Sequence, residues 1–469
     1  MNHKQMAHTI KRIFIALAIA TLFAGCASVE VAERPDAAPM QTVDPAFAQA
    51  RNLAANDAAL SGQARADNAR QIERLLSGLD SATLSANTAS LVAGDPLYAF
   101  AGRALLRRGL PLPRAFDRGA QWRFDASNRP PADRDGYRPP LKLAVLLPLS
   151  GSLATAAAPV RDGLLAGYYG ERRARPEIQF YDTAGTAGGA VAAYARAAAE
   201  GSDFVVGPLG RDEVSALFNE SGLSVPMLAL NRGNVSPPAG NASFSLTPED
   251  EAISAAEYLL SRNARRVLVL SAGEAGMSRA VAAFRERFGE RGGVVVDALT
   301  VNDKADGLLP ALQAAAAKEG GIDAVFLAVK GAQARAAVPM LSATGLNAKP
   351  RVATSQLMSG TGKPEQDRVL DGIIFPSDAW SARGAPGLPA ANMTGQNLPT
   401  ARGAAARLFA FGYDAWLITA YLERLATGSD AQIQGATGDL RIDGFGNVMR
   451  TPAWSTFSGG VAMPLAGGG

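Results

Sequence analysis

Histidine and cysteine, the side chains that most often carry nucleophilic, acid–base or metal chemistry, occur only near the start of the sequence. The histidines are His3 and His8, and the single cysteine is Cys26. The rest of the chain therefore lacks the residues for Ser-His-Asp or Cys-His systems and for histidine-ligated zinc. Carboxylate chemistry stays open, but no two acidic residues stand out at a spacing that would fix them in a hydrolytic site. We expect a protein that is not an enzyme and holds no metal or cofactor.

The surroundings of Cys26 indicate a lipid attachment site. Three basic residues precede an apolar run from Ile13 to Ala24, and Gly25 and Cys26 follow directly. This is the layout of a secretory signal with a small-residue cleavage site, and the run is too short to span a bilayer. We expect residues 1–25 to be removed and the thiol of Cys26 to be acylated, although a signal peptide with an incidental cysteine is the alternative.

The residues after Cys26 bear on which membrane the lipid enters. Ala27 and Ser28 follow the cysteine, and no aspartate stands next to it to signal retention in the inner membrane. We therefore expect a lipid anchor in the outer membrane, with the protein facing the periplasm.

The charge balance argues against a nucleic-acid partner. The formal net charge is +3, and residues 1–25 contain three basic residues and no acidic ones, so their removal leaves a net charge of zero. The remaining sequence shows no clustered basic stripe of the kind that nucleic-acid binding requires.

Composition divides the first 140 residues into three further segments. Residues 26–43 hold prolines among small and polar residues, which is typical of a flexible tether. Residues 44–116 are rich in Ala, Leu and Arg with apolar positions at helical spacing, which predicts a short all-α module. Two Pro-Pro pairs among charged residues mark 117–140 as a linker.

From Leu141 onward, short apolar runs alternate with amphipathic helices, a pattern that predicts parallel sheets built from βαβ units. Two series of about five strands exceed what one doubly wound sheet usually holds, so the α/β region 141–469 should form two lobes. A helix predicted over 407–426 should return the chain to the first lobe. The predicted lobes are 141–248 with 377–434 for the first, and 249–376 with 435–463 for the second.

Four ordered strings within this region resemble one known family. They are AVLLPLSGSLATAAAPVRDGLLAGYY, DFVVGPLGRDEVSAL, RLFAFGYDAW and GATGDLRIDGFGNVMRTPAW. They are similar to the LppC/LpoA family of outer-membrane lipoproteins, the penicillin-binding protein activators. The resemblance implies a two-lobed fold of the type I periplasmic-binding-protein class.

The same resemblance implies a function and a partner. A family member would reach from the outer membrane to a class A penicillin-binding protein and stimulate its peptidoglycan synthesis, without being a synthase itself. This chain departs from the family before residue 141, because well-known members carry a long helical-repeat domain there and this chain has only residues 44–116.

Candidate cleft residues follow the predicted strands, because open α/β sheets place ligands at the carboxyl ends of their strands. Ser150 and Gly151 open the loop before a helix, where a hydroxyl and backbone N–H groups can hold an anionic group or simply cap the helix. The full candidate set is Ser150, Gly151, Gly210, Asn231, Arg232, Lys330, Ser355 and Gln356.

The sequence leaves a second function open. A lipid-anchored receptor for a small solute, such as an amino acid or a wall peptide, would have the same fold. Such a receptor needs convergent polar groups from both lobes, whereas an activator can use its outer surface instead.

Overall fold

The computed structural model describes residues 43–60, 62–116, 122, 128–220 and 222–465. The predicted signal peptide and Cys26 lie outside the described residues. Residues Asp44–Gly469 form one compact unit. None of the helices in the described ranges combines the length and apolar character needed to cross a bilayer.

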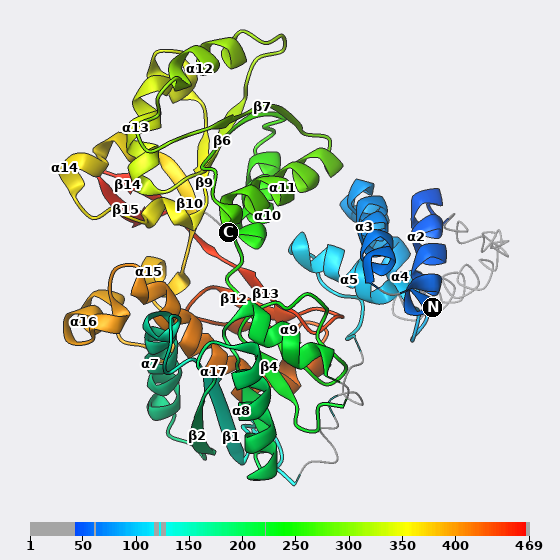
Figure 1. Cartoon of the computed structure of the whole chain (residues 1–469). Coiled ribbons are helices and arrows are strands. Elements are labelled where there is room, and N and C mark those ends of the chain that lie inside the picture. The colour runs from blue at the N-terminus through cyan, green and yellow to red at the C-terminus, as the bar shows by residue number, and fades with distance from the viewer. Residues whose placement is uncertain (1–42, 61, 117–121, 123–127, 221, 466–469) are drawn as a thin grey trace, which may run out of the picture. The chain divides into compact units, whose positions relative to one another are not determined.

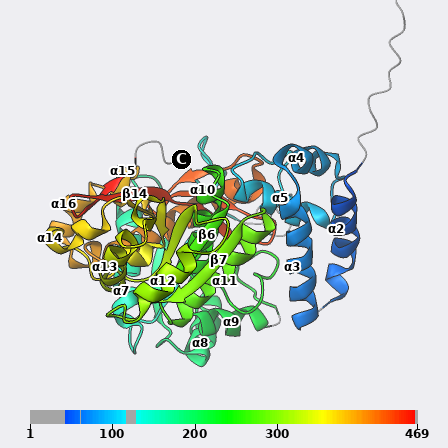
Figure 2. The same cartoon turned by 90° about the horizontal axis from the view of Figure 1, so that it is seen from above.

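Four α-helices form the N-terminal module, and α2 and α3 lie side by side (Figures 1 and 2). Their bounds are Pro45–Asn56 (α2), Gly62–Gly78 (α3), Ser81–Ser90 (α4) and Leu97–Arg107 (α5). Asp44 and Asp80 start α2 and α4 by accepting backbone N–H bonds, from Ala46 at 2.8 Å and Thr83 at 2.9 Å. The apolar faces meet in one core that includes Phe47, which shows why this alanine- and leucine-rich segment folds.

The first lobe is built on a parallel sheet of five strands in the order β2-β1-β3-β4-β5. The strands are Lys142–Leu147 (β1), Glu177–Asp182 (β2), Phe204–Val206 (β3), Met227–Ala229 (β4) and Ala242–Ser243 (β5). Alternate residues of β1 face two different cores, which is why the strand is apolar from Leu143 to Leu147.

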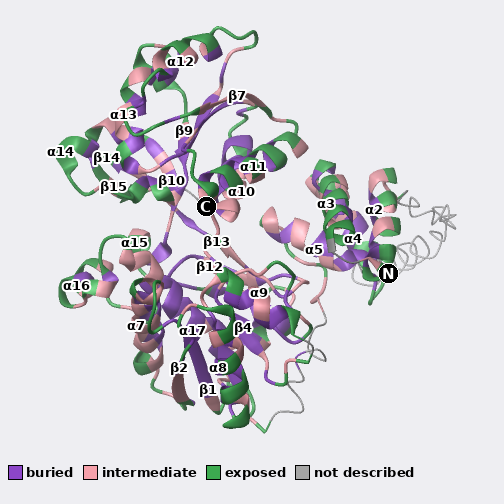
Figure 3. Cartoon of the chain, in the orientation of Figure 1, coloured by how far each residue is buried: buried purple, intermediate pink, exposed green. Residues whose placement is uncertain are grey.

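Helices cover both faces of this sheet. They are Ala154–Gly170 (α7), Ala187–Ala199 (α8), Arg211–Asn219 (α9) and Ala405–Thr427 (α17). Leu143 and Val145 of β1 pack against α7 and α17, whereas Ala144 and Leu146 pack against α8 and α9. Figure 3 shows the resulting pattern, with β1 and α17 largely buried and α8 partly exposed.

The second lobe holds a mixed sheet in the order β15-β14-β10-β9-β8-β6-β7. Its strands are Arg266–Ser271 (β6), Val294–Thr300 (β7), Ala324–Ala328 (β8), Arg351–Ala353 (β9), Ile373–Ser377 (β10), Ala453–Ser458 (β14) and Val461–Pro464 (β15). Its helices are Pro248–Ser261 (α10), Ala275–Glu290 (α11), Leu308–Ala316 (α12), Gly331–Ser342 (α13) and Pro364–Asp367 (α14). The central strands β6 and β8 are buried almost throughout, as strands covered on both faces must be.

The chain between β10 and α17 contains two short helices, Ala379–Arg383 (α15) and Ala391–Asn397 (α16). Trp380 of α15 stacks on Phe409 of α17 with ring centroids 5.1 Å apart. This contact fastens the returning segment to the first lobe.

The C-terminal strands correct one part of the sequence prediction, which placed all of 435–463 in the second lobe. The strands Ile433–Gln434 (β11), Asp439–Ile442 (β12) and Val448–Thr451 (β13) form a small antiparallel sheet whose apolar side chains join the core of the first lobe. The backbone N–H of Ser243 in β5 donates to the carbonyl of Gly446 at 2.9 Å. Only β14 and β15 join the second sheet, so the chain changes lobe near Pro452.

Asp414 of α17 holds this small sheet in place. Its carboxylate accepts N–H bonds from Ala436 at 2.5 Å and Thr437 at 2.8 Å. Complete burial raises the pKa of Asp414 to about 7, against the lowering effect of these donors. These contacts give Asp414 a role in packing the small sheet against α17.

Helices α7 and α17 approach each other closely because glycines stand at their crossing. A Cβ atom added at Gly412 would lie 1.9 Å from the carbonyl oxygen of Val160, and one added at Gly163 would lie 1.9 Å from that of Phe409. Both obstructing atoms belong to the backbone, so only a shift of a whole helix could relieve the overlap.

Replacing Gly412 by Ala should therefore destabilise the protein by about 1–3 kcal/mol or more, as overpacking of a core does. The matched control is Gly188→Ala in α8, where an added Cβ meets nothing within 4 Å. That substitution should be neutral or stabilise by up to about 1 kcal/mol. Urea denaturation followed by circular dichroism measures the stability of both variants. Equal unfolding midpoints would contradict the claim that α7 and α17 pack too closely for a side chain at Gly412.

Candidate functional site

Ser150 and Gly151 lie just beyond β1, as predicted, but their polar groups are engaged locally. The backbone N–H groups of Leu149 and Ser150 donate to Oδ1 of Asp182 at 2.8 and 3.2 Å. The Ser150 side chain also bonds to Asp182, and this bond lowers the pKa of that carboxyl group. Gly151 has a φ of 79°, and an added Cβ would lie 2.8 Å from the carbonyl oxygen of Ala184.

Gly210 and Asn231 shape the loops after β3 and β4. The N–H of Gly210 donates to Oε2 of Glu213 at 2.6 Å, which starts α9. The side-chain amide of Asn231 donates to the carbonyl of Leu209 at 2.9 Å and so ties two neighbouring loops together. Both contacts serve the fold, and a role for either residue in binding a ligand stays a prediction.

Arg232 and Lys330 each pair with an acidic residue. Arg232 follows β4 of the first lobe and contacts Asp250, in the first turn of α10, at 2.6 Å. Lys330 contacts Glu274 at 2.8 Å within the second lobe, where both side chains are close to half exposed. The Arg232 pair thus joins the two lobes, whereas the Lys330 pair does not.

Ser355, which follows β9, is held by a buried carboxylate. Its N–H donates to Oε2 of Glu251 and its hydroxyl donates to Oε1, both at 2.9 Å. Glu251 stands in the first turn of α10, and its side chain is only 2% exposed. The neighbouring Gln356 is exposed and is not drawn into this contact.

Two arginines of the first lobe complete the charge cluster around Glu251. Arg407 of α17 donates to both Glu251 and Ser355. Arg450 of β13 donates to Glu251 at 3.3 Å and lies 3.7 Å from Asp378, the residue that links β10 to α15. The cluster therefore joins elements of both lobes where the chain passes between them.

The two carboxyl groups of the cluster have opposite pKa shifts. Burial opposes ionisation of Glu251, but Arg407 and Arg450 outweigh it, so the pKa of Glu251 lies below its ordinary value. Burial raises the pKa of Asp378, and the same arginines only partly offset that rise. On balance, the two arginines thus favour the charged form of Glu251.

The sequence analysis named Ser355 and Arg232 as cleft candidates, not as contacts between the lobes, and it missed Glu251, Arg407 and Arg450. One signal was present in the acidic run 249–251, which follows Pro248 in the first turn of α10. Consecutive helical residues point about 100° apart, so three acids in one turn cannot share one partner. In the structure Glu249 pairs with Arg279, Asp250 pairs with Arg232, and Glu251 pairs with Arg407.

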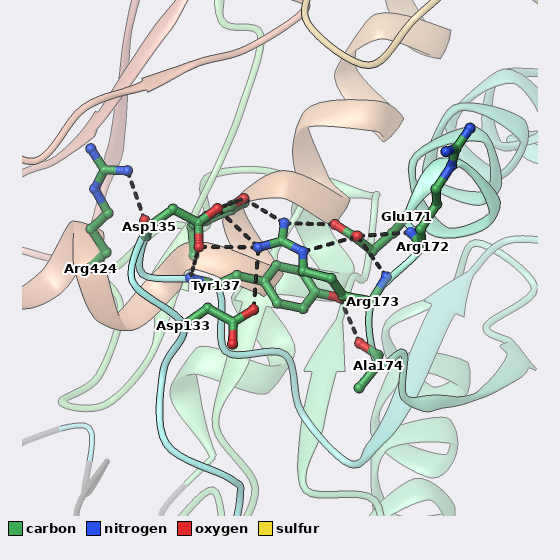
Figure 4. A network of polar contacts seen from close by, with 9 residues as sticks. Asp133, Asp135, Tyr137, Glu171, Arg172, Arg173, Ala174 and Arg424 are labelled. Atoms are coloured by element: carbon green, nitrogen blue, oxygen red, sulfur yellow. Dashed lines mark hydrogen bonds and ion pairs between the residues drawn. The ribbon is translucent and has the colours of Figure 1, made fainter.

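The segment before β1, predicted as a linker, is fastened to the first lobe by Arg173 (Figure 4). The Arg173 guanidinium contacts Asp135 and Glu171 at 2.9 Å each and lies 3.8 Å over the ring of Tyr137. Tyr421 of α17 donates its hydroxyl to Asp135 at 2.9 Å. Residues 133–137 thus lie against the lobe, whereas 117–121 and 123–127 are outside the described residues.

Two α/β lobes, one on a parallel sheet and one on a mixed sheet, joined by three chain crossings, define a periplasmic-binding-protein-like class of protein. A family model described as "LppC putative lipoprotein" matches residues 137–460. The chain belongs to this family.

Individual relatives agree with this assignment. The chain is 27% identical over 355 residues to "Penicillin-binding protein activator LpoA" of Photobacterium profundum, covering 69% of this chain and 57% of that protein. The chain thus spans less than two thirds of the length of such curated relatives.

Solved structures share the fold. Full-length LpoA from Haemophilus influenzae superposes with a TM-score of 0.61 at 18% identity, covering 89% of this chain and 78% of that one. A structure from Chromobacterium violaceum, described as "a putative branched-chain amino acid ABC transporter", has a TM-score of 0.54 at 30% identity and covers 68% of this chain and 100% of that one.

Replacing Arg407 by Ala should destabilise the protein by about 3–5 kcal/mol, because it leaves Glu251 buried with one partner fewer. The matched control is Arg402→Ala, five residues earlier on an exposed position, which should change the free energy of unfolding by no more than about 0.5 kcal/mol. Guanidinium titrations of both variants give the comparison. A loss at Arg407 no larger than at Arg402 would show that the cluster does not hold the lobes.

Proposed function

We propose that this protein is a lipid-anchored activator of a class A penicillin-binding protein. The observation that carries the proposal is the family match over residues 137–460, together with relatives named as penicillin-binding protein activators. In this proposal Cys26 carries the lipid, the outer membrane holds it, and the two-lobed region faces the synthase in the periplasm.

The contacts between the lobes support an activator over a solute receptor. A receptor cleft needs polar groups free to converge on a ligand. Here Ser355 and Arg232 are already engaged, by Glu251 and Asp250 respectively. The protein's own charges satisfy the groups that a solute would otherwise bind.

The activator has no catalytic activity of its own in this proposal and acts through a contact surface. A contact of standard size buries about 1,200–2,000 Å² and concentrates its energy in a few aromatic or arginine anchors. The region from Leu141 onward supplies this surface, and the helical module chiefly sets reach and orientation.

A solute receptor is the second candidate, favoured by the likeness to the Chromobacterium violaceum structure. Under that reading, Ser150 and Asn231 would contact the solute. Saturable binding of an amino acid that is lost on replacing either residue would favour it.

The test is the rate of glycan polymerisation and cross-linking by class A synthases of the same organism, with and without residues 27–469. The rate should rise in a saturable manner, and residues 133–469 should suffice in solution, because the family match begins at 137 and Asp135 and Tyr137 lie against the first lobe. The protein alone, given lipid-linked precursor, should yield no product and serves as the control. No change in rate for any class A synthase would contradict the proposal.

A further inference from the structure

A cavity of about 570 Å³ lies away from most of the predicted cleft residues. It is lined by the end of α5, by one face of α10 and by the segment from β12 to β14, and of the candidate set only Arg232 contributes. Its volume falls within the range of ordinary small-molecule sites.

Arginine dominates the lining of this cavity. Seven arginines line it, against three acidic residues, Asp250, Glu257 and Asp443. Each of these acids is already paired with an arginine, at 2.6 to 2.8 Å. The acidic residues therefore do not neutralise the remaining arginines.

Three of the lining arginines have no carboxylate partner among the described residues. Arg108 donates to the carbonyls of Leu79, Leu76 and Ser77, and its buried Nε has no acceptor in the described structure. Arg441 donates two hydrogen bonds to Oε1 of Gln432, from Nε at 3.0 Å and from Nη2 at 2.6 Å.

Arg262 is the third and lies at the exposed rim. Its guanidinium stacks 3.5 Å over the ring of Tyr258, so this ring orients the cation without neutralising it. Arg108, Arg441 and Arg262 thus bring three positive charges to one cavity, and their guanidinium groups can donate further hydrogen bonds.

The cavity also has an apolar wall. Tyr258 and Trp454 pack together with ring centroids 4.5 Å apart, and Ile253 and Met449 extend the same lining. A ligand that suits both parts carries at least two anionic groups and an apolar or ring-shaped portion.

We propose that this cavity binds a small polyvalent anion bearing carboxylate or phosphate groups, with Arg262 and Arg441 contacting the anionic groups and Tyr258 and Trp454 packing against the remainder. Because the helical module and both lobes line the cavity, such a ligand would stabilise all three together.

The test titrates the mature protein with citrate and, separately, with inorganic pyrophosphate, by calorimetry and by thermal melting. Sodium chloride keeps the ionic strength constant, since screening alone changes surface electrostatics. At least one anion should bind saturably and raise the melting temperature. Binding of citrate but not of pyrophosphate indicates a carboxylate ligand. Binding of pyrophosphate but not of citrate indicates a phosphate ligand.

The variant Arg262→Gln/Arg441→Gln should weaken that binding at least tenfold. The control is Arg172→Gln, an exposed arginine of the first lobe that does not line the cavity. If the double variant fails to fold, Arg262→Gln alone decides, because Arg262 is exposed and Arg441 then stays in place. Absence of binding by both anions, or equal binding by wild type and variant, would overturn the proposal.

Discussion

The buried carboxylate of Glu251 is the constraint on which the arrangement of the two lobes depends. It sits at the start of α10, where the chain first enters the second lobe, and accepts from Ser355 of that lobe and from Arg407 and Arg450 of the first. A charge this deeply buried is tolerated only when paired and hydrogen-bonded. The lobes therefore cannot separate at this point without exposing or orphaning a charge.

This constraint changes what a periplasmic-binding-protein-like fold can do. Solute receptors of this general design rely on lobes that move apart and close on a ligand. In the present protein, ion pairs from Arg407, Arg450 and Arg232 already join the lobes. The fold is then better suited to presenting a fixed surface to a partner than to capturing a solute.

The sequence predicted those features whose cause is local. The apolar run that begins at Leu141 forms β1, Lys142–Leu147, because a strand covered on both faces is apolar where it is buried, here from Leu143 to Leu147. The helix expected over 407–426 is α17, Ala405–Thr427, and most of its aromatic residues are buried. The two-lobed α/β fold with a preceding helical module followed from the same patterns.

Features that depend on contacts between distant residues could not be predicted. Arg407 and Arg450 stand 156 and 199 residues beyond Glu251, so nothing in the local sequence marks them as its partners. The misplaced boundary after 435 has the same origin, because β12 and β13 add their apolar side chains to the core of the first lobe, far away in sequence, and Asp414 and Ser243 hold the residues beside these strands.

The distance between the two lobes in solution tests whether the ion pairs around Glu251 hold the lobes fixed. Cys26 is the only cysteine, so a Cys26→Ala background carrying Ala195→Cys in α8 and Glu286→Cys in α11, both exposed positions, accepts one spin label on each lobe. Pulsed electron resonance should give one narrow distance distribution, unchanged by a mixture of amino acids and broadened by Arg407→Ala. A broad distance distribution without Arg407→Ala that narrows when amino acids are added would contradict the claim that the lobes are fixed. It would show instead that the lobes close on a solute.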